Sequence, residues 1–132
     1  MKEVLDSKFL LTHYITDDEE VLSRTRAKLA QLRKERRGVL PSIVLAEVTN
    51  AVCRAGGRDK ALAQVRALEH YGLEVVPLDV GLARDAGFLR CVHRDLPLAD
   101  CIIAATALRL GARVITDDPH FSKVKGLRTT WI

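Results

Sequence analysis

Short apolar runs recur along the chain, separated by longer segments in which apolar residues have a helical spacing. Gly38, Gly72 and Gly111 each end a helical segment just before an apolar run begins. Such runs of Val, Leu and Ile bounded by turn residues are typical of buried β-strands. We expect five strands, at residues 2–6, 39–41, 73–78, 112–116 and 127–132.

The intervening segments carry apolar residues three or four positions apart, which is the spacing of one face of an α-helix. Thr16 and Glu19 predict a capping box for one helix. Ser42 and Asp79 predict N-caps for two others, and Pro97 suits the first turn of a third. We expect helices at residues 9–15, 16–37, 42–57, 59–72, 79–91 and 97–111.

Alternation of strands with helices predicts the fold class. It implies βαβ units and a mostly parallel sheet covered by helices on both faces. On the helix at 42–57, Leu45, Val48 and Val52 share the face that we expect to pack inward. Because the chain has no linker, internal repeat or low-complexity segment, we expect one α/β domain over residues 1–132.

The composition of the 132 residues is that of a globular protein, with 48% hydrophobic and 29% charged residues. An aromatic content of 5% argues against a large aromatic platform for stacking bases. The formal net charge is +4. A basic surface suits a polyanionic partner, although many small proteins are this basic for solubility alone.

The three cysteines, Cys53, Cys91 and Cys101, are an odd number without a C-x-x-C motif. They favour a reducing compartment and three small buried side chains over disulfides or a zinc site. No secretory leader is expected, because Met1 runs directly into a charged strand start. No apolar run approaches the ~20 residues of a membrane span. We therefore expect a cytoplasmic protein without a membrane partner.

Four carboxylates lie where predicted apolar elements meet a loop or helix: Asp6, Glu47, Asp100 and Asp118. The carboxyl ends of parallel strands share one edge of a sheet, so we expect these side chains to gather there. At about 5 Å and an effective dielectric constant of about 20, each like-charged pair costs about 3 kcal/mol unless a cation offsets it. Mg²⁺ held by carboxylates typically acts on phosphates. Without these four, 13 acidic and 21 basic residues leave a surplus of +8.

Each of these acids also has an ordinary structural interpretation. Asp6 and Ser7 could simply cap the helix that follows them. Glu47 shares a helix side with apolar residues and needs a partner, which Arg54 could provide. Asp100 precedes an apolar, small-sided helix, but pure capping is expected one turn earlier.

Asp117 and Asp118 directly follow a predicted strand, and Pro119 fixes the turn. We expect one of the two carboxylates to face the site and the other to face solvent. The structural alternative is an Asx-turn. Four acids at four such junctions carry more weight together than any one of them alone.

Taken together, these residues resemble PIN-domain ribonucleases, in particular the VapC-type toxins of toxin–antitoxin pairs, over nearly the whole chain. The resemblance rests on four short patterns: Asp6–Ser7 at a strand end, Ser42-x₄-Glu47, Asp100 before an Ala-rich helix, and Thr116-x-Asp118-x-x-Phe121. Any one of these patterns would be weak evidence, but the set is fairly specific.

The resemblance implies a three-layer α/β/α sandwich with a sheet of about five strands and Mg²⁺-dependent endonuclease cleavage of RNA, with Mn²⁺ able to substitute. It implies an acidic metal site formed by Asp6, Glu47, Asp100 and Asp118. The Thr-x-Asp pattern selects Asp118 over Asp117. Ser7 and Thr116 fall where hydroxyls support the acids in the family, so they are supporting candidates together with Asp117.

The resemblance also implies partners. These are an RNA substrate, an antitoxin whose tail blocks the acidic pocket, and a second copy of the chain in a homodimer. Nothing in the sequence marks the dimer interface, and a housekeeping nuclease remains an alternative to a toxin.

Two positions depart from the family pattern. Lys8 stands where a small polar residue is common, and it could bind a phosphate or partly neutralise the acids. His120 stands where many members have a further Asp, and we expect it to be a surface turn residue rather than a ligand. Both departures affect the expected metal stoichiometry more than the fold.

Two other function classes compete with the nuclease. A PIN-like module with a poorly metallated site could bind RNA or protein without cutting it, and Lys8 favours this alternative. A phospho-receiver domain is disfavoured because residues 73–78 end without an acceptor Asp, and no nucleotide-binding glycine motif is present. Several basic residues are candidates to follow an RNA backbone: Arg33, Lys34, Arg36, Arg37, Arg54, Arg58 and Lys60. For residues 33–37 a solvated helix face is favoured.

Overall fold

The computed structural model describes residues 1–132 and contains a five-stranded sheet in which all strands run parallel. The strand order is β3-β2-β1-β4-β5. The bounds are β1 Glu3–Leu5, β2 Gly38–Pro41, β3 Glu74–Val76, β4 Arg113–Ile115 and β5 Thr129–Thr130. The predicted parallel α/β sheet is confirmed, although the last strand has only two paired residues.

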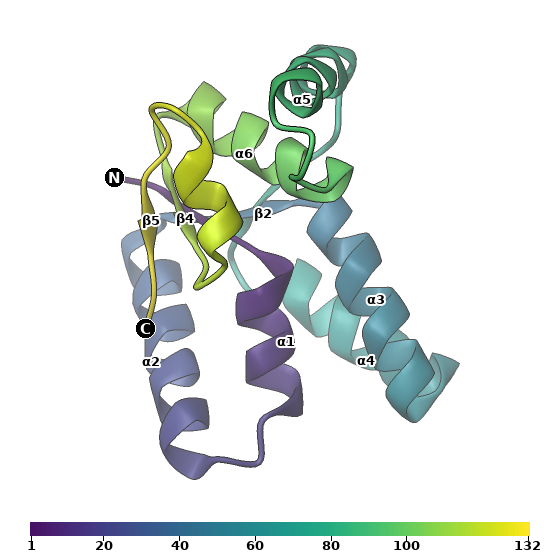
Figure 1. Cartoon of the computed structure of the whole chain (residues 1–132). Helices are drawn as coiled ribbons and strands as arrows, with labels where there is room; N and C mark the ends of the chain where they lie inside the picture. The colour runs from purple at the N-terminus through teal and green to yellow at the C-terminus, as the bar shows by residue number, and fades with distance from the viewer.

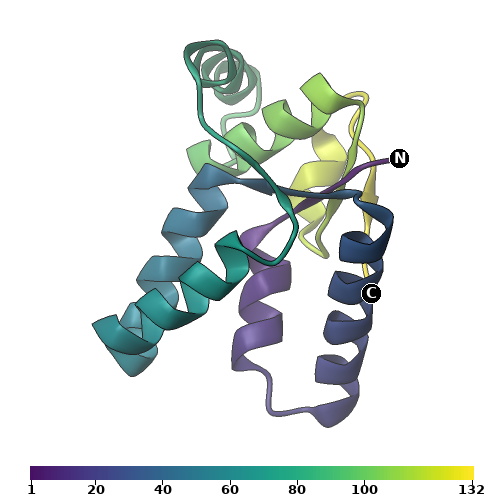
Figure 2. The same ribbon diagram turned by 180° about the vertical axis from the view of Figure 1, so that it is seen from behind.

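Six α-helices and one 3₁₀ helix connect the strands. They are α1 Ser7–Ile15, α2 Glu19–Glu35, α3 Ser42–Gly56, α4 Arg58–Glu69, α5 Val80–Val92, α6 Leu98–Leu110 and η1 Pro119–Lys123. Helices α1 to α4 lie below the sheet and α5 and α6 above it (Figure 1), an arrangement also seen from behind (Figure 2). The predicted three-layer arrangement is therefore confirmed. No helix is both long and apolar enough to cross a membrane.

The layering follows from the order in which the chain visits the strands. From β1 through β2 to β3 the chain steps in one direction across the sheet, and it then returns to β4 on the other side of β1. Right-handed crossovers therefore place the later helices on the opposite face. The boundary between the paired strands β1 and β4 is the topological switch point of the sheet. Parallel sheets bind ligands at such a point, outside the carboxyl ends of the strands.

Helix α6 is the most deeply buried helix. Seven consecutive residues, from Cys101 to Ala107, are buried, four of them alanine or cysteine. Small side chains let the helix lie close to the sheet, where it contacts β1 and β4. The start of α6 is therefore held firmly beside the carboxyl ends of these two strands.

The predicted capping box of α2 is wrong. Asp18 is the N-cap, and its Oδ1 accepts hydrogen bonds from the backbone N–H groups of Glu20 and Val21. Thr16 instead accepts a hydrogen bond from the Asp18 N–H and shapes the preceding turn. A carboxylate that reaches two free N–H groups of the first turn is a strong cap, which explains the later start of the helix.

Two other predicted helix starts also differ. Ser42 does not cap α3, because its hydroxyl accepts a hydrogen bond from the backbone N–H of Leu78 in the loop after β3. Pro97 occupies the N-cap position of α6 rather than its first turn. The predicted cap at Asp79 is confirmed by a 2.8 Å hydrogen bond from the Leu82 N–H.

Some predictions about burial are also wrong. Cys53 and Cys91 are exposed, and only Cys101 is buried. On α3, Leu45 is only partly buried, and Val44 takes the fully buried position. Val48 and Val52 are buried as predicted, so only the first position of the inward stripe differs from the prediction.

Glu3 in β1 is a buried charge that the sequence did not reveal, with a side chain that is 0% exposed. Its carboxylate contacts Lys28 Nζ at 2.9 Å, Arg37 Nη1 at 2.9 Å and Arg113 Nε at 3.1 Å. Burial raises the pKa of Glu3, but the hydrogen bonds and charges of Lys28 and Arg113 outweigh it, and the pKa lies below its usual value. Glu3 thus ties α2, β2 and β4 to the amino-terminal edge of β1.

We expect Glu3→Gln to lower the free energy of unfolding by about 3 kcal/mol, because it leaves three cations without their counter-charge. Urea denaturation at neutral pH measures this loss. Since the folded-state pKa lies below 4.5, the stabilisation is present above pH 4.5 and is lost as the pH falls through the folded pKa. Glu35→Gln, which removes only a half-exposed contact with Arg37, is the matched control. Equal stability of the two variants would contradict the assignment.

Candidate metal centre

Asp6 and Thr116 join the two strands at the switch point. Asp6 directly follows β1 and is 3% exposed, and Thr116 directly follows β4. Thr116 Oγ1 donates a 2.7 Å hydrogen bond to Asp6 Oδ2, and Ser7 Oγ lies 3.4 Å from Asp6 Oδ1. Asp6 occupies the N-cap position of α1, but its side chain makes no capping hydrogen bond. The capping interpretation of Asp6 is therefore wrong.

Asp118 lies beside this pair in the turn after β4. Its backbone N–H donates a 3.1 Å hydrogen bond to Thr116 Oγ1, so one hydroxyl connects the Asp118 backbone to the Asp6 carboxylate. Asp118 Oδ1 also accepts a 2.9 Å hydrogen bond from the His120 N–H. The turn interpretation is therefore correct in part, but it leaves Asp118 Oδ2 free.

Asp117, the neighbour of Asp118 in the chain, lies on the surface. It is exposed and forms an ion pair with Lys8 at 3.6 Å, in which both side chains are about half exposed. Lys8 forms no ion pair with the four predicted site acids, so it does not neutralise them directly. The placement agrees with the choice of Asp118 over Asp117.

Asp100 lies in the first turn of α6 and makes no capping hydrogen bond. Burial raises its pKa to about 6, and the negative charges of Asp6, Asp118 and Glu47 add to the effect. Because all three other acids act on Asp100, the structure brings the four predicted carboxylates into one cluster with Asp100 at its centre.

Glu47 enters the cluster from the second turn of α3. Its Oε1 is buried and has no hydrogen-bond partner, and the exposed Arg54 forms no ion pair with it. Burial raises the pKa of Glu47 above its usual value, a side-chain hydrogen bond with Ser7 lowers it in part, and the charge of Asp6 raises it further. Burial also raises the pKa of Asp6, with a smaller contribution from Asp118. The pairing of Glu47 with Arg54 is therefore wrong, and a buried carboxylate oxygen remains available at the cluster.

His120, which we expected to be a surface turn residue, is exposed in η1 and lies beside two of the predicted acids. One ligand atom from each of Asp100, Asp118 and His120 lies within 4.8 Å of the other two. His120 Nδ1 is 3.1 Å from Asp118 Oδ1. The available signal was the position of His120 two residues after Asp118, in a turn fixed by Pro119.

The basic residues 33–37 lie far from this cluster along the strands. They end α2 just before β2 begins, and Arg37 contacts Glu3 at the start of β1. They therefore lie at the amino-terminal edge, opposite to the four acids. Arg54, Arg58 and Lys60 lie exposed at the α3–α4 junction and stay candidates for RNA contacts.

The PIN-domain family model matches residues 4–127, which include both strands of the switch point and all four acids. The chain belongs to the PIN-domain family. No curated protein matches the sequence.

Solved structures support the same fold. VapBC2 from Rickettsia felis, bound to a DNA fragment from its promoter, has 18% identity and a TM-score of 0.77 and covers 100% of this PIN domain and 99% of that chain. DNA-bound VapBC from Salmonella typhimurium has 23% identity and a TM-score of 0.76, with 99% and 98% covered. VapC20 from Mycobacterium tuberculosis, a Sarcin-Ricin loop cleaving toxin, has 17% identity and a TM-score of 0.76, with 96% and 99% covered. At these identities the similarity establishes the shared fold.

The residues of this PIN domain fit a divalent cation. The cluster offers carboxylate oxygens, the ligands that Mg²⁺ and Mn²⁺ prefer, and Glu47 Oε1 has no protein partner. The pKa values of Asp6, Glu47 and Asp100 are raised mainly by burial and also by the neighbouring acids, and a cation would relieve both effects.

We expect Asp100→Asn to stabilise the metal-free protein at neutral pH. The folded-state pKa of about 6 exceeds the ordinary 3.8, so the stability linked to Asp100 is present below pH 3.8 and is lost as the pH rises through about 6. Because Asp100 is partly solvated, we expect a gain on the order of 1 kcal/mol. Urea denaturation in EDTA measures it, with exposed Asp17→Asn as the control. A loss of stability in Asp100→Asn would contradict the crowding of charge.

Proposed function

We propose that this PIN domain is a metal-dependent endoribonuclease that hydrolyses RNA phosphodiester bonds and serves as the toxin of a toxin–antitoxin pair. The observation that carries the proposal is the cluster of four carboxylates at the switch point, with three pKa values raised by burial and mutual charge. Such a cluster favours a divalent cation, and phosphodiester hydrolysis is the common chemistry of carboxylate-held Mg²⁺.

The proposed roles follow from the contacts of each side chain. Asp6, Asp100 and Asp118 hold the cation, and Thr116 keeps Asp6 in place through its 2.7 Å hydrogen bond. Glu47 Oε1, which has no protein partner, orients the attacking water and accepts its proton. The chemistry that bound Mg²⁺ or Mn²⁺ supplies is Lewis-acid stabilisation of the charge that develops on the scissile phosphate.

An antitoxin is the second proposed partner. The solved complexes of VapBC from Rickettsia felis and of a toxin–antitoxin pair from Klebsiella pneumoniae share this fold. We propose that a cognate antitoxin covers the acidic cluster and prevents RNA from reaching it. A housekeeping nuclease would have no such partner, so co-purification with the product of a neighbouring reading frame distinguishes the two.

The alternative function is a PIN-like module that binds RNA or protein without cutting it. Lys8 favoured this alternative because it could neutralise the acids. Since Lys8 pairs with Asp117 at the rim instead, the geometry favours the nuclease. The experiment below separates the two functions directly.

The test is cleavage of a mixed pool of structured and single-stranded RNAs in Mg²⁺, Mn²⁺ or EDTA. We expect cutting by the wild type with either metal and none in EDTA. Asp100→Asn and Glu47→Gln should lower the rate by at least about 100-fold, because each removes charge at the reacting phosphate.

Asp17→Asn, which changes an exposed aspartate at the start of α2, is the matched control and should cut at the wild-type rate. An inactive wild type that still binds RNA would favour the binding module. Cutting that persists in EDTA would exclude the metal-dependent mechanism.

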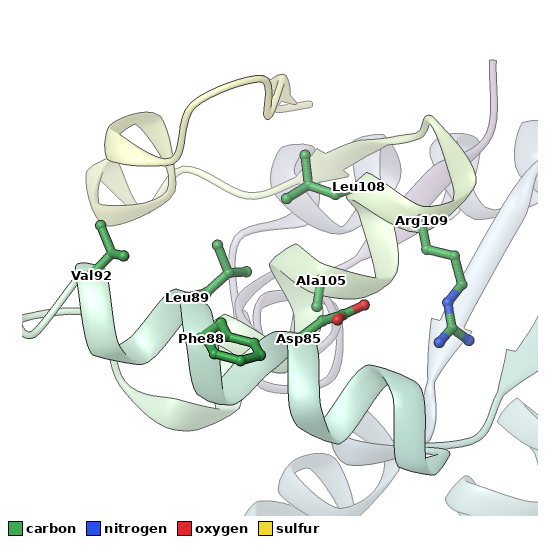
Figure 3. A pocket seen from close by; sticks show the side chains of 7 residues that line it. All are labelled: Asp85, Phe88, Leu89, Val92, Ala105, Leu108 and Arg109. Carbon is green, nitrogen blue, oxygen red and sulfur yellow. The ribbon is translucent and has the colours of Figure 1, made fainter.

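We also propose that the chain forms a homodimer through a groove between α5 and α6. The groove has a volume of about 530 Å³, and Figure 3 shows apolar side chains of both helices facing it, with Asp85 and Arg109 at one end. On the same face, Phe88 and Val92 are 67% and 75% exposed. A two-fold contact needs a protruding side chain and a hollow on one surface, and this face has both.

Phe88→Asp should therefore convert the dimer to a monomer, because it would place a charge in a desolvated contact. Analytical ultracentrifugation measures the change. The control is Leu62→Asp, which changes an exposed apolar residue on α4, away from the groove, and should leave the dimer intact. A wild type that stays monomeric at high concentration would contradict the homodimer.

A further inference from the structure

We propose that His120 is a nitrogen ligand of the metal held by Asp100 and Asp118 and that it makes the centre select Mn²⁺ over Mg²⁺. The inference rests on the proposed function, because it concerns the metal of the same site. It adds a ligand that the motif pattern does not supply and assigns a preference between two ions that carboxylates alone bind similarly.

The three side chains lie close enough together to share one ion. One ligand atom each from Asp100, Asp118 and His120 can be enclosed within 4.8 Å. His120 Nδ1 lies 3.1 Å from Asp118 Oδ1. Two neighbouring ligands at right angles on an octahedral ion with bonds of about 2.1–2.2 Å are separated by about 3.0–3.1 Å. The observed separation therefore fits two ligand atoms on one ion.

The turn at Pro119 fixes the backbone that carries the imidazole beside Asp118. The His120 N–H donates to Asp118 Oδ1 at 2.9 Å, and Pro119 fixes the backbone between them. The side chains of His120 and Asp118 are 46% and 32% exposed. The imidazole therefore lies at the mouth of the cluster, where an ion can reach it without any movement of the core.

The ligand atoms of the cluster also favour one of the two ions. Mg²⁺ takes oxygen ligands and demands near-ideal geometry, whereas imidazole nitrogen favours first-row transition metals. Carboxylates also suit Mn²⁺, so a set of three carboxylate side chains and one imidazole favours Mn²⁺ over Mg²⁺. A site with four carboxylates in these positions would lack this preference.

The same 3.1 Å contact also allows a different role, in which His120 only donates a hydrogen bond that orients Asp118. That role would affect the binding of both ions alike. The ratio of the two affinities therefore separates a ligand from an orienting group.

The test is calorimetric titration of the full chain with Mn²⁺ and Mg²⁺ separately, for wild type, His120→Asp and His120→Ala. We expect wild type to bind Mn²⁺ at least about tenfold more tightly than Mg²⁺, and His120→Asp to lose most of this preference. His120→Ala should lose about tenfold in Mn²⁺ affinity and much less in Mg²⁺ affinity. Because the ratio is measured within each variant, a general loss of stability does not imitate the result.

Pulsed electron paramagnetic resonance of bound Mn²⁺ gives a second readout. A ¹⁴N coupling should appear in wild type and vanish in both His120 variants. It should persist in the control His70→Ala, which changes an exposed histidine directly after α4. Mn²⁺ binding without this coupling, or with an unchanged affinity ratio in the variants, would overturn the role of His120 and leave the proposed nuclease intact. If wild type bound neither ion, both proposals would fail.

Discussion

Repulsion among the carboxylates at the β1–β4 switch point is the constraint on which the rest of the site depends. Burial and mutual charge raise the pKa of Asp100 to about 6. The fold maintains this unfavourable cluster because each acid is anchored to an element that is stable for other reasons. Glu47 and Asp100 extend from packed helices, and Thr116 holds Asp6. In the function proposed for this cluster, a bound cation would relieve this cost in stability.

The opposite edge of the sheet shows how the same fold treats a charge that serves structure. Glu3 is fully buried, but three cations surround it, and its pKa is lowered. Asp6, which directly follows the carboxyl end of the same strand, has a raised pKa and no cationic partner. One short strand thus carries a compensated charge at its amino end and an uncompensated one at its carboxyl end.

The sequence predicted the sheet and the meeting of the four acids, because both follow from the order of strands and helices. It did not predict the network of Glu3, because strand periodicity does not identify cations contributed by residues 28, 37 and 113. The sequence placed His120 correctly in a surface turn but did not predict its contact with Asp118, since that contact depends on the geometry of the turn. The N-cap of α2 at Asp18 was also not predicted, because several neighbouring residues could equally have capped the helix and only the backbone geometry decides between them.

The most direct test of the central claim is the number of protons released when Mn²⁺ binds, measured by calorimetry in buffers of different ionisation enthalpy. If one ion occupies the acid cluster, binding near pH 5.5 releases roughly one proton or more, because Asp100 is mostly protonated there and the pKa values of Asp6 and Glu47 are also raised. Binding well above pH 7 releases almost none. Binding without proton release at pH 5.5 would contradict a cation site centred on Asp100.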